Sequence, residues 1–254
     1  MTTDAHPAVL STHDLSWRAG GVDIINDVSL DLRAGEFLSV IGPNGAGKSS
    51  LINLLSGTVR PTRGRIVLNG VDVTKEHRAR RAHHGVGRTF QTSSIFSDLT
   101  VLENVRLSRQ ARTGGSLSLV RWPRRRDAAT QASLEMLEAV SLHHAANRRA
   151  GTLSHGDKRK LEIAVVAVQQ PQVLLLDEPT SGASAEEVGV IIDVARRIHG
   201  LGNSVLMVEH RIELVSEVSD RVAVMANGSL LMVDQPDVVL ADPTVQAAYL
   251  GEGL

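Results

Sequence analysis

With 254 residues, the chain is long enough for one large domain or for a core that carries a subdomain. Its formal net charge of −1 excludes a chain-wide basic surface for nucleic acid, and its lack of cysteine excludes a disulfide framework and thiolate metal sites. No apolar run approaches the roughly 20 residues that span a bilayer, and residues 1–7 lack the apolar stretch of a signal peptide, so we expect a cytoplasmic protein.

The chain is predicted to begin with two strands, over residues 8–17 and 22–33, joined by a turn at Gly20-Gly21. In the second strand the apolar residues keep a two-residue period that slips once near Asn26. Trp17 lies just before the turn. It is either a platform on which an adenine ring stacks or an aromatic of the core, and the sequence leaves both interpretations open.

A glycine-rich stretch follows an apolar run at 37–41 and precedes an apolar helical pattern at 51–55. It matches the pattern G-x-x-x-x-G-K-[ST] and consists of Gly42, Pro43, Asn44, Gly45, Ala46, Gly47, Lys48, Ser49 and Ser50. Its glycines let backbone N–H groups approach phosphate oxygens, and the following helix points its positive end at the same anion. We expect Lys48 to bind the β- and γ-phosphates and the Ser49 hydroxyl to ligate Mg²⁺. The stretch therefore predicts a nucleotide-binding loop.

The middle of the chain changes from strands to helices. The sequence predicts, in order, a turn at 61–64, a short strand at 65–69, an exposed basic helix at 75–82 and a strand at 85–90. Thr100 and Glu103 form a capping-box pattern, which places a helix start at Val101. A loop over 112–123 and a second helix over about 124–140 follow. Because residues 92–150 carry no strand pattern, we expect an inserted helical subdomain.

The alternation of strands and helices then resumes. The continuous apolar runs at 173–177 and 205–208 are typical of strands buried on both faces. A second capping box opens a helix at Ser184 that runs to about His199. The chain ends with a hairpin that turns at Asn227-Gly228 and with short helices over 237–250.

Polar residues lie where these elements end or begin. Asp177 and Glu178 follow the first buried strand, where one carboxylate can hold the Mg²⁺ shell and the other can polarise water. His210 follows the next buried strand and can donate a hydrogen bond to a γ-phosphate. Gln91 can orient the water or contact the metal. Residues 153–157 precede a helix whose N-terminus would be a second anion site.

This ordered set resembles the nucleotide-binding subunit of ABC transporters, over about residues 8–250. The similar segments are Gly42–Ser49 (Walker A), Gln91 (Q-loop), Leu153–Asp157 (signature loop), Leu174–Asp177 with Glu178 (Walker B and catalytic glutamate), Ser181–Ser184 (D-loop) and His210 (switch histidine). The resemblance implies ATP and Mg²⁺ as cofactors. It implies catalytic roles for Glu178, His210 and Gln91, metal contacts for Ser49, Gln91 and Asp177, and γ-phosphate contacts for Ser154 and Gly156.

The resemblance also implies an α/β fold, in which a P-loop NTPase (ABC ATPase) core carries an antiparallel β subdomain and an inserted α-helical subdomain. The core and β subdomain would comprise 8–91 and 151–250, and the helical subdomain about 92–150. The implied partners are transmembrane permease subunits, a second ATPase subunit in a head-to-tail dimer and, indirectly, a solute-binding protein, with no nucleic acid. The chain would then lie on the inner face of the cell membrane as a peripheral subunit.

Within that family, residues 86–91, 99–104, 208–210 and 245–251 resemble the ATPases of branched-chain amino-acid importers. Importers of urea or short amides have similar ATPases and remain an alternative, as does a soluble ABC ATPase that acts on nucleic acid or ribosomes. The soluble class usually carries two cassettes or long coiled coils, whereas this sequence has one phosphate loop and no long heptad run. A GTP-binding switch would need an N-K-x-D motif, which the sequence does not contain.

Several positions depart from the family pattern. His155 stands where the signature usually has Gly, Asp157 where it has Gln, and Ser184 where the D-loop ends in Asp or Asn. The aromatic that stacks on adenine usually lies nearer Ala19 than Trp17 does.

Overall fold

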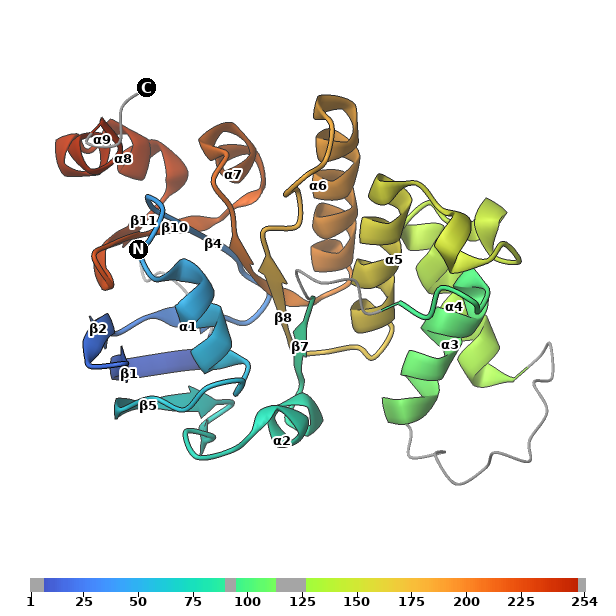
Figure 1. Ribbon diagram of the computed structural model, residues 1–254, viewed down its shortest axis with the longest axis horizontal. Helices are drawn as coiled ribbons and strands as arrows, with labels where there is room; N and C mark the ends of the chain where they lie inside the picture. The colour runs from blue at the N-terminus through green and yellow to red at the C-terminus, as the bar shows by residue number, and fades with distance from the viewer. Residues whose placement is uncertain (1–6, 90–94, 113–126, 251–254) are drawn as a thin grey trace.

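The computed structural model describes residues 7–89, 95–112 and 127–250, and it shows a mixed α/β fold with two sheets (Figure 1). Within these residues, no helix combines the length and the apolar character that crossing a membrane requires. Gln91 lies outside the described residues, so its predicted position next to the metal stays a prediction.

The core sheet is mainly parallel and has the strand order β11-β10-β4-β9-β8-β7. Its strands are β4 (Phe37–Ile41), β7 (Val86–Arg88), β8 (Val173–Asp177), β9 (Ser204–Val208), β10 (Arg221–Ala226) and β11 (Ser229–Asp234). Only β11 runs antiparallel to its neighbour. Leu174 and Leu176 of β8 face one hydrophobic core, and Val173 and Leu175 face the other. Burial on both faces explains why the predicted strands β8 and β9 show no polar alternation.

An antiparallel sheet packs beside this core. It contains β1 (Ala8–Ala19), β2 (Val22–Val28), β3 (Asp31–Arg33), β5 (Arg63–Leu68) and β6 (Val71–Asp72). The prediction of one strand over 22–33 is wrong, because β2 and β3 pair with different stretches of β1. Asp27 has a φ of 48°, and the Leu30 N–H donates to Thr12 Oγ1 at 2.9 Å instead of joining the ladder. The slip in the apolar period near Asn26 lies inside β2, where the pairing with β1 shifts register between Ile25 and Val28.

The helices are α1 (Lys48–Leu55), α2 (Arg78–His83), α3 (Val101–Arg112), α4 (Ala128–Ala139), α5 (His155–Ala167), α6 (Ala185–Gly200), α7 (Ile212–Val218), α8 (Pro236–Ala241) and α9 (Pro243–Leu250). α3, α4 and α5 pack against one another beside α6, and α1 packs against β2 and β8 (Figure 1). The capping boxes at Thr100 and Ser184 are confirmed by reciprocal hydrogen bonds. The predicted start of α4 at residue 124 is wrong, because the Asp127 side chain caps the helix by accepting from Thr130 N.

Candidate nucleotide-binding site

The phosphate loop connects β4 to α1 and is held in place by close backbone contacts. A Cβ atom on Gly42 would lie 2.1 Å from the Met225 carbonyl oxygen, and one on Gly47 would lie 2.8 Å from Ile25 Cδ1. Both glycines have positive φ angles, 151° and 98°. The hairpin turn adds a hydrogen bond from Gly228 N to Ala46 O at 3.1 Å. Gly42 and Gly47 are therefore required by packing and by backbone conformation, as a tight anion-binding loop demands.

Lys48 places its charge inside this loop. Its side-chain amine donates to the carbonyl oxygens of Gly42, at 2.5 Å, and of Pro43, at 2.8 Å. The residue is only 4% exposed. A charged phosphate is a stronger acceptor for an ammonium than a neutral carbonyl is. The loop thus contains a buried cation whose hydrogen bonds can be exchanged for an anionic ligand.

Arg81 fixes the opposite end of α1, although residues 75–82 were expected to be exposed. That expectation is wrong for Arg81, which is fully buried. Its guanidinium donates to the carbonyls of Leu54 and Leu55, at the C-terminus of α1, and to two further carbonyls of the segment before α2. Burial lowers the pKa of Arg81 to about 10, so the group stays charged at neutral pH. A cation at this end complements the helix dipole of α1.

Asp177 ends β8, and its two carboxylate oxygens have different surroundings. Oδ2 accepts a hydrogen bond from Arg88 Nη2 at 2.9 Å, while Oδ1 is buried and has no hydrogen-bond partner among the described residues. Burial raises the pKa of Asp177, and the Arg88 guanidinium opposes this change. Arg88 also donates to Asn53 Oδ1 on α1, at 2.7 Å. Asn53 follows Ser49 by one helical turn, so the Ser49 hydroxyl lies on the same face of α1.

These residues fit Mg²⁺. A hydroxyl and a carboxylate oxygen are the hard ligands that this ion prefers, and the buried Oδ1 of Asp177 lacks the partner that a cation would provide. Among the described residues, no cluster of three or more His, Cys, Asp and Glu side chains could hold a metal ion. Such an ion would therefore complete its shell with water and phosphate oxygens, as Mg²⁺ commonly does.

Glu178 and His210 meet at the carboxyl ends of two adjacent strands. β8 and β9 are parallel neighbours, and the Glu178 N–H donates to the Val208 carbonyl at 3.0 Å. One hydrogen bond of 2.7 Å joins Glu178 Oε1 to His210 Nε2. Glu178 has a φ of 47°, an uncommon conformation for a residue other than glycine. The side chains of Glu178 and His210 are 22% and 40% exposed, so both reach solvent at the strand end where ligands bind in open α/β sheets.

Ser154 and Gly156 lie at the N-terminus of α5, as predicted. Ser154 Oγ caps the helix by accepting from Asp157 N at 3.1 Å. The Gly156 N–H donates to Glu187 Oε1 of α6 at 3.0 Å. Figure 1 shows α5 on the other side of β8 from α1. The chain therefore does not bring its own α5 N-terminus to its own phosphate loop.

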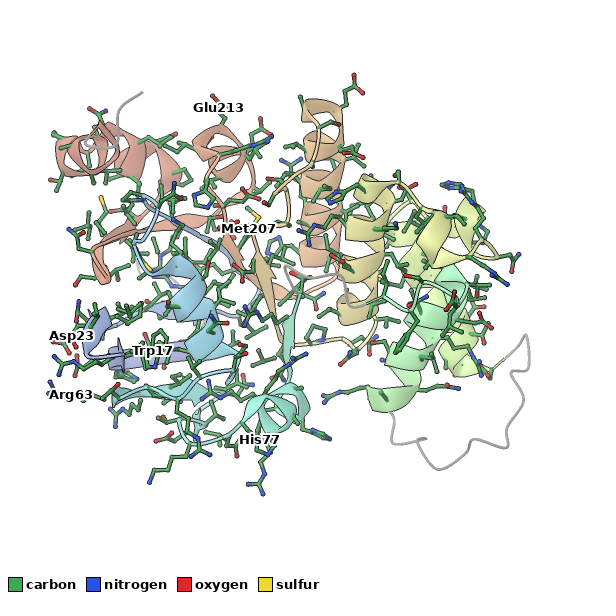
Figure 2. All side chains as sticks on the ribbon, in the orientation of Figure 1. Trp17, Asp23, Arg63, His77, Met207 and Glu213 are labelled. Atoms are coloured by element: carbon green, nitrogen blue, oxygen red, sulfur yellow. The ribbon has the colours of Figure 1, made fainter. Side chains whose placement is uncertain are left out.

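Two residues with clear contacts to these elements had no role in the sequence analysis. Arg88 belongs to residues 86–91, which resemble the family, and its place in a short predicted strand was the signal that could have found it. Glu187 is the third residue of the helix that the capping box at Ser184 opens, and its contact with Gly156 was not predicted. Trp17 packs partly buried against the core of the antiparallel sheet and lines a pocket of about 290 Å³ with Asp23 and Arg63 (Figure 2).

Comparison with known proteins agrees with this geometry. A family model described as "ABC transporter" matches residues 25–181. The chain is 38% identical to the branched-chain amino acid transport ATP-binding protein LivG of Salmonella typhimurium over 250 residues, which cover 96% of this chain and 98% of that protein. It is 35% identical to the related protein BraF of Pseudomonas aeruginosa, with the same coverage. A crystal structure of an ATP-binding cassette of an ABC transporter in its ADP conformation superposes with a TM-score of 0.85 at 29% identity, covering 96% of this chain and 99% of the other. The chain belongs to the ABC transporter family, as an ATP-binding subunit that hydrolyses ATP.

Proposed function

We propose that this subunit energises the import of branched-chain or other hydrophobic amino acids, together with separate transmembrane permease subunits. The supporting observation is the identity of 38% to LivG over nearly the full length of both chains. The similarity to BraF points to the same solute class. In this proposal the chain is a peripheral subunit on the inner face of the cell membrane, and a solute-binding protein delivers the amino acid to the permeases.

In the proposed reaction, the phosphate loop binds the phosphates of ATP. Lys48 exchanges the carbonyls of Gly42 and Pro43 for β- and γ-phosphate oxygens, which are stronger acceptors. The N–H groups at the start of α1 donate to the same phosphates. Mg²⁺, when bound near Ser49 and Asp177, neutralises negative charge on the phosphates.

Glu178 is the proposed general base. Its carboxylate accepts a proton from the water whose oxygen attacks the γ-phosphorus, and the bond from that phosphorus to the bridging oxygen of ADP breaks. The hydrogen bond to His210 supports one orientation of the carboxylate, and the imidazole is proposed to donate a hydrogen bond to the γ-phosphate. Gln91 is proposed to orient the same water or to contact the metal.

A dimer would explain the second predicted anion site, at the N-terminus of α5. Ser154 and Gly156 lie at a helix N-terminus on the other side of β8 from the phosphate loop, so we propose that they meet the γ-phosphate of ATP bound to another ATPase subunit. The Gly156 N–H must then exchange its hydrogen bond to Glu187 for one to the phosphate. ATP would favour the closed head-to-tail dimer, and hydrolysis would release it.

Reconstitution tests this function. The chain is assembled in vesicles with the permeases and solute-binding protein encoded beside its gene, and phosphate release is measured with the binding protein empty or loaded. The proposal expects stimulation by leucine, isoleucine or valine, and none in the Glu178→Gln complex. Stimulation by urea or a short amide would assign the chain to the alternative importers. Co-purification with RNA or ribosomes, and with no polytopic membrane protein, would reject a transport role.

A further inference from the structure

Arg88 connects the two elements that carry the proposed metal ligands. Its side chain is only 11% exposed and lies between the end of β8 and the C-terminal half of α1. Nη2 donates to Asp177 Oδ2 at 2.9 Å. Nη1 lies within hydrogen-bond distance of Asn53 Oδ1 at 2.7 Å, Ser56 Oγ at 2.9 Å and Thr58 Oγ1 at 3.2 Å. One guanidinium therefore contacts the Walker B strand end and the phosphate-loop helix at the same time.

The contacts on α1 lie on the face that carries Ser49. Ser49, Asn53 and Ser56 are spaced at i, i+4 and i+7, which places them on one side of a helix. The planar guanidinium holds its donors in a fixed fork, which a flexible ammonium cannot reproduce across several acceptors. One rigid group thus links the face of α1 that carries Ser49 to the Asp177 end of β8.

The contact on β8 also distinguishes the two oxygens of Asp177. Arg88 donates to Oδ2, and Oδ1 is buried with no hydrogen-bond partner in the part of the chain that the structure describes. Because Asp177 is nearly fully buried, water cannot freely replace the guanidinium if that contact is lost.

We infer that Arg88 is a positioning residue of the nucleotide site: it fixes the Asp177 carboxylate so that Oδ1 is directed to the metal shell, and it ties β8 to the face of α1 that carries Ser49. This inference rests on the metal roles proposed for Ser49 and Asp177. If Arg88 only neutralised a buried carboxylate, replacing it would not change how strongly Mg²⁺ raises the affinity for nucleotide. A positioning role predicts that this enhancement falls.

The test compares nucleotide affinity with and without the metal. In the Glu178→Gln background, which prevents turnover, the affinity for a fluorescent ATP analogue is measured in excess Mg²⁺ and in EDTA. The ratio of the two affinities is the Mg²⁺ enhancement. Arg88→Met is expected to lower this enhancement by about tenfold or more, the usual effect of removing a residue that orients a metal ligand, while affinity in EDTA changes by less than about twofold.

Two further variants keep the test decisive. Arg88→Lys retains the charge but not the fork, so it is expected to give an intermediate enhancement, and it replaces Arg88→Met if that protein does not fold. Arg221→Lys is the matched control, because Arg221 is also partly buried between carboxylates, those of Asp31 and Glu36, but at the opposite end of the core strands. It is expected to keep the wild-type enhancement.

An unchanged enhancement in the folded Arg88 variants, or an equal loss of affinity in EDTA and in Mg²⁺, would overturn the inference. Ser49→Ala and Asp177→Asn separate this failure from a failure of the proposed site. If both keep the enhancement, the proposed metal ligands are wrong. If both lose it while the Arg88 variants keep it, only the positioning role of Arg88 is wrong.

Discussion

Replacing Glu178 with glutamine changes one charge at the end of β8 with little change in shape. Among the described residues, the Glu178 side chain makes one hydrogen bond, the one of 2.7 Å between Oε1 and His210 Nε2, and an amide oxygen can accept it. The variant should therefore fold and bind ATP as the wild type does. It should not accept a proton from water, because a carboxamide is a far weaker base than a carboxylate.

The expected decrease in the rate of ATP hydrolysis follows from the loss of the general base. General base catalysis contributes about 10²- to 10⁴-fold, so hydrolysis should fall by at least about a hundredfold, or about 2.7 kcal/mol in the barrier. His210→Ala removes the hydrogen bond that orients the carboxylate. If the two residues act together, the double variant should be little slower than Glu178→Gln alone, because residues that act as a unit are not additive.

The rate of phosphate release under saturating Mg-ATP measures hydrolysis by each variant, and a fluorescent ATP analogue measures nucleotide binding. Glu186→Gln is the matched control, because this exposed glutamate lies in the first turn of α6, outside the proposed site. It should turn over at the wild-type rate. A Glu178→Gln rate within about threefold of wild type would refute the assignment of the base.

Three other variants test the phosphate loop, the buried guanidinium of Arg81 and the proposed dimer contact. Lys48→Ala removes the cation from the phosphate loop and should weaken ATP binding in a nucleotide titration; unchanged affinity would contradict the loop assignment. Arg81→Met removes the donor of four carbonyl contacts and should lower the free energy of unfolding by about 3 kcal/mol in urea, against a change below about 0.5 kcal/mol for the exposed Arg80→Met. Ser154→Arg should abolish the Mg-ATP-dependent dimer of the Glu178→Gln protein in light scattering; a dimer that persists would reject the proposed γ-phosphate contact.

The sequence predicts the parts of this protein that depend on short-range pattern. The strand–loop–helix around residues 42–50, the turn at Asn227-Gly228 and the capping boxes at Thr100 and Ser184 each depend on residues a few positions apart, and the structure contains each of them. The boundary of α4 was missed because the cap at Asp127 is not a full capping box, so the start could not be read from the pattern.

The parts that could not be predicted depend on contacts between distant segments. Arg81 lies in a basic helix that looks exposed, but it is fully buried, and two of its four carbonyl acceptors belong to Leu54 and Leu55 of the distant helix α1. Arg88 and Asp177 lie 89 positions apart and meet because β7 pairs with β8. The pattern of apolar residues within either segment cannot predict a contact between the two segments. The sequence placed Glu178 and His210 each after a buried strand, but it did not predict the hydrogen bond between them, which forms because β8 and β9 are parallel neighbours.

A structure of the Glu178→Gln protein with Mg-ATP would locate the nucleotide and the metal on the chain. We expect the phosphates on residues 42–50, with Lys48 Nζ moved from the carbonyls of Gly42 and Pro43 to phosphate oxygens. We expect the metal beside Ser49 and on the side of Asp177 Oδ1, while Oδ2 keeps its hydrogen bond to Arg88. Phosphates bound elsewhere, or a metal that contacts neither Ser49 nor the shell of Asp177, would contradict the proposed site.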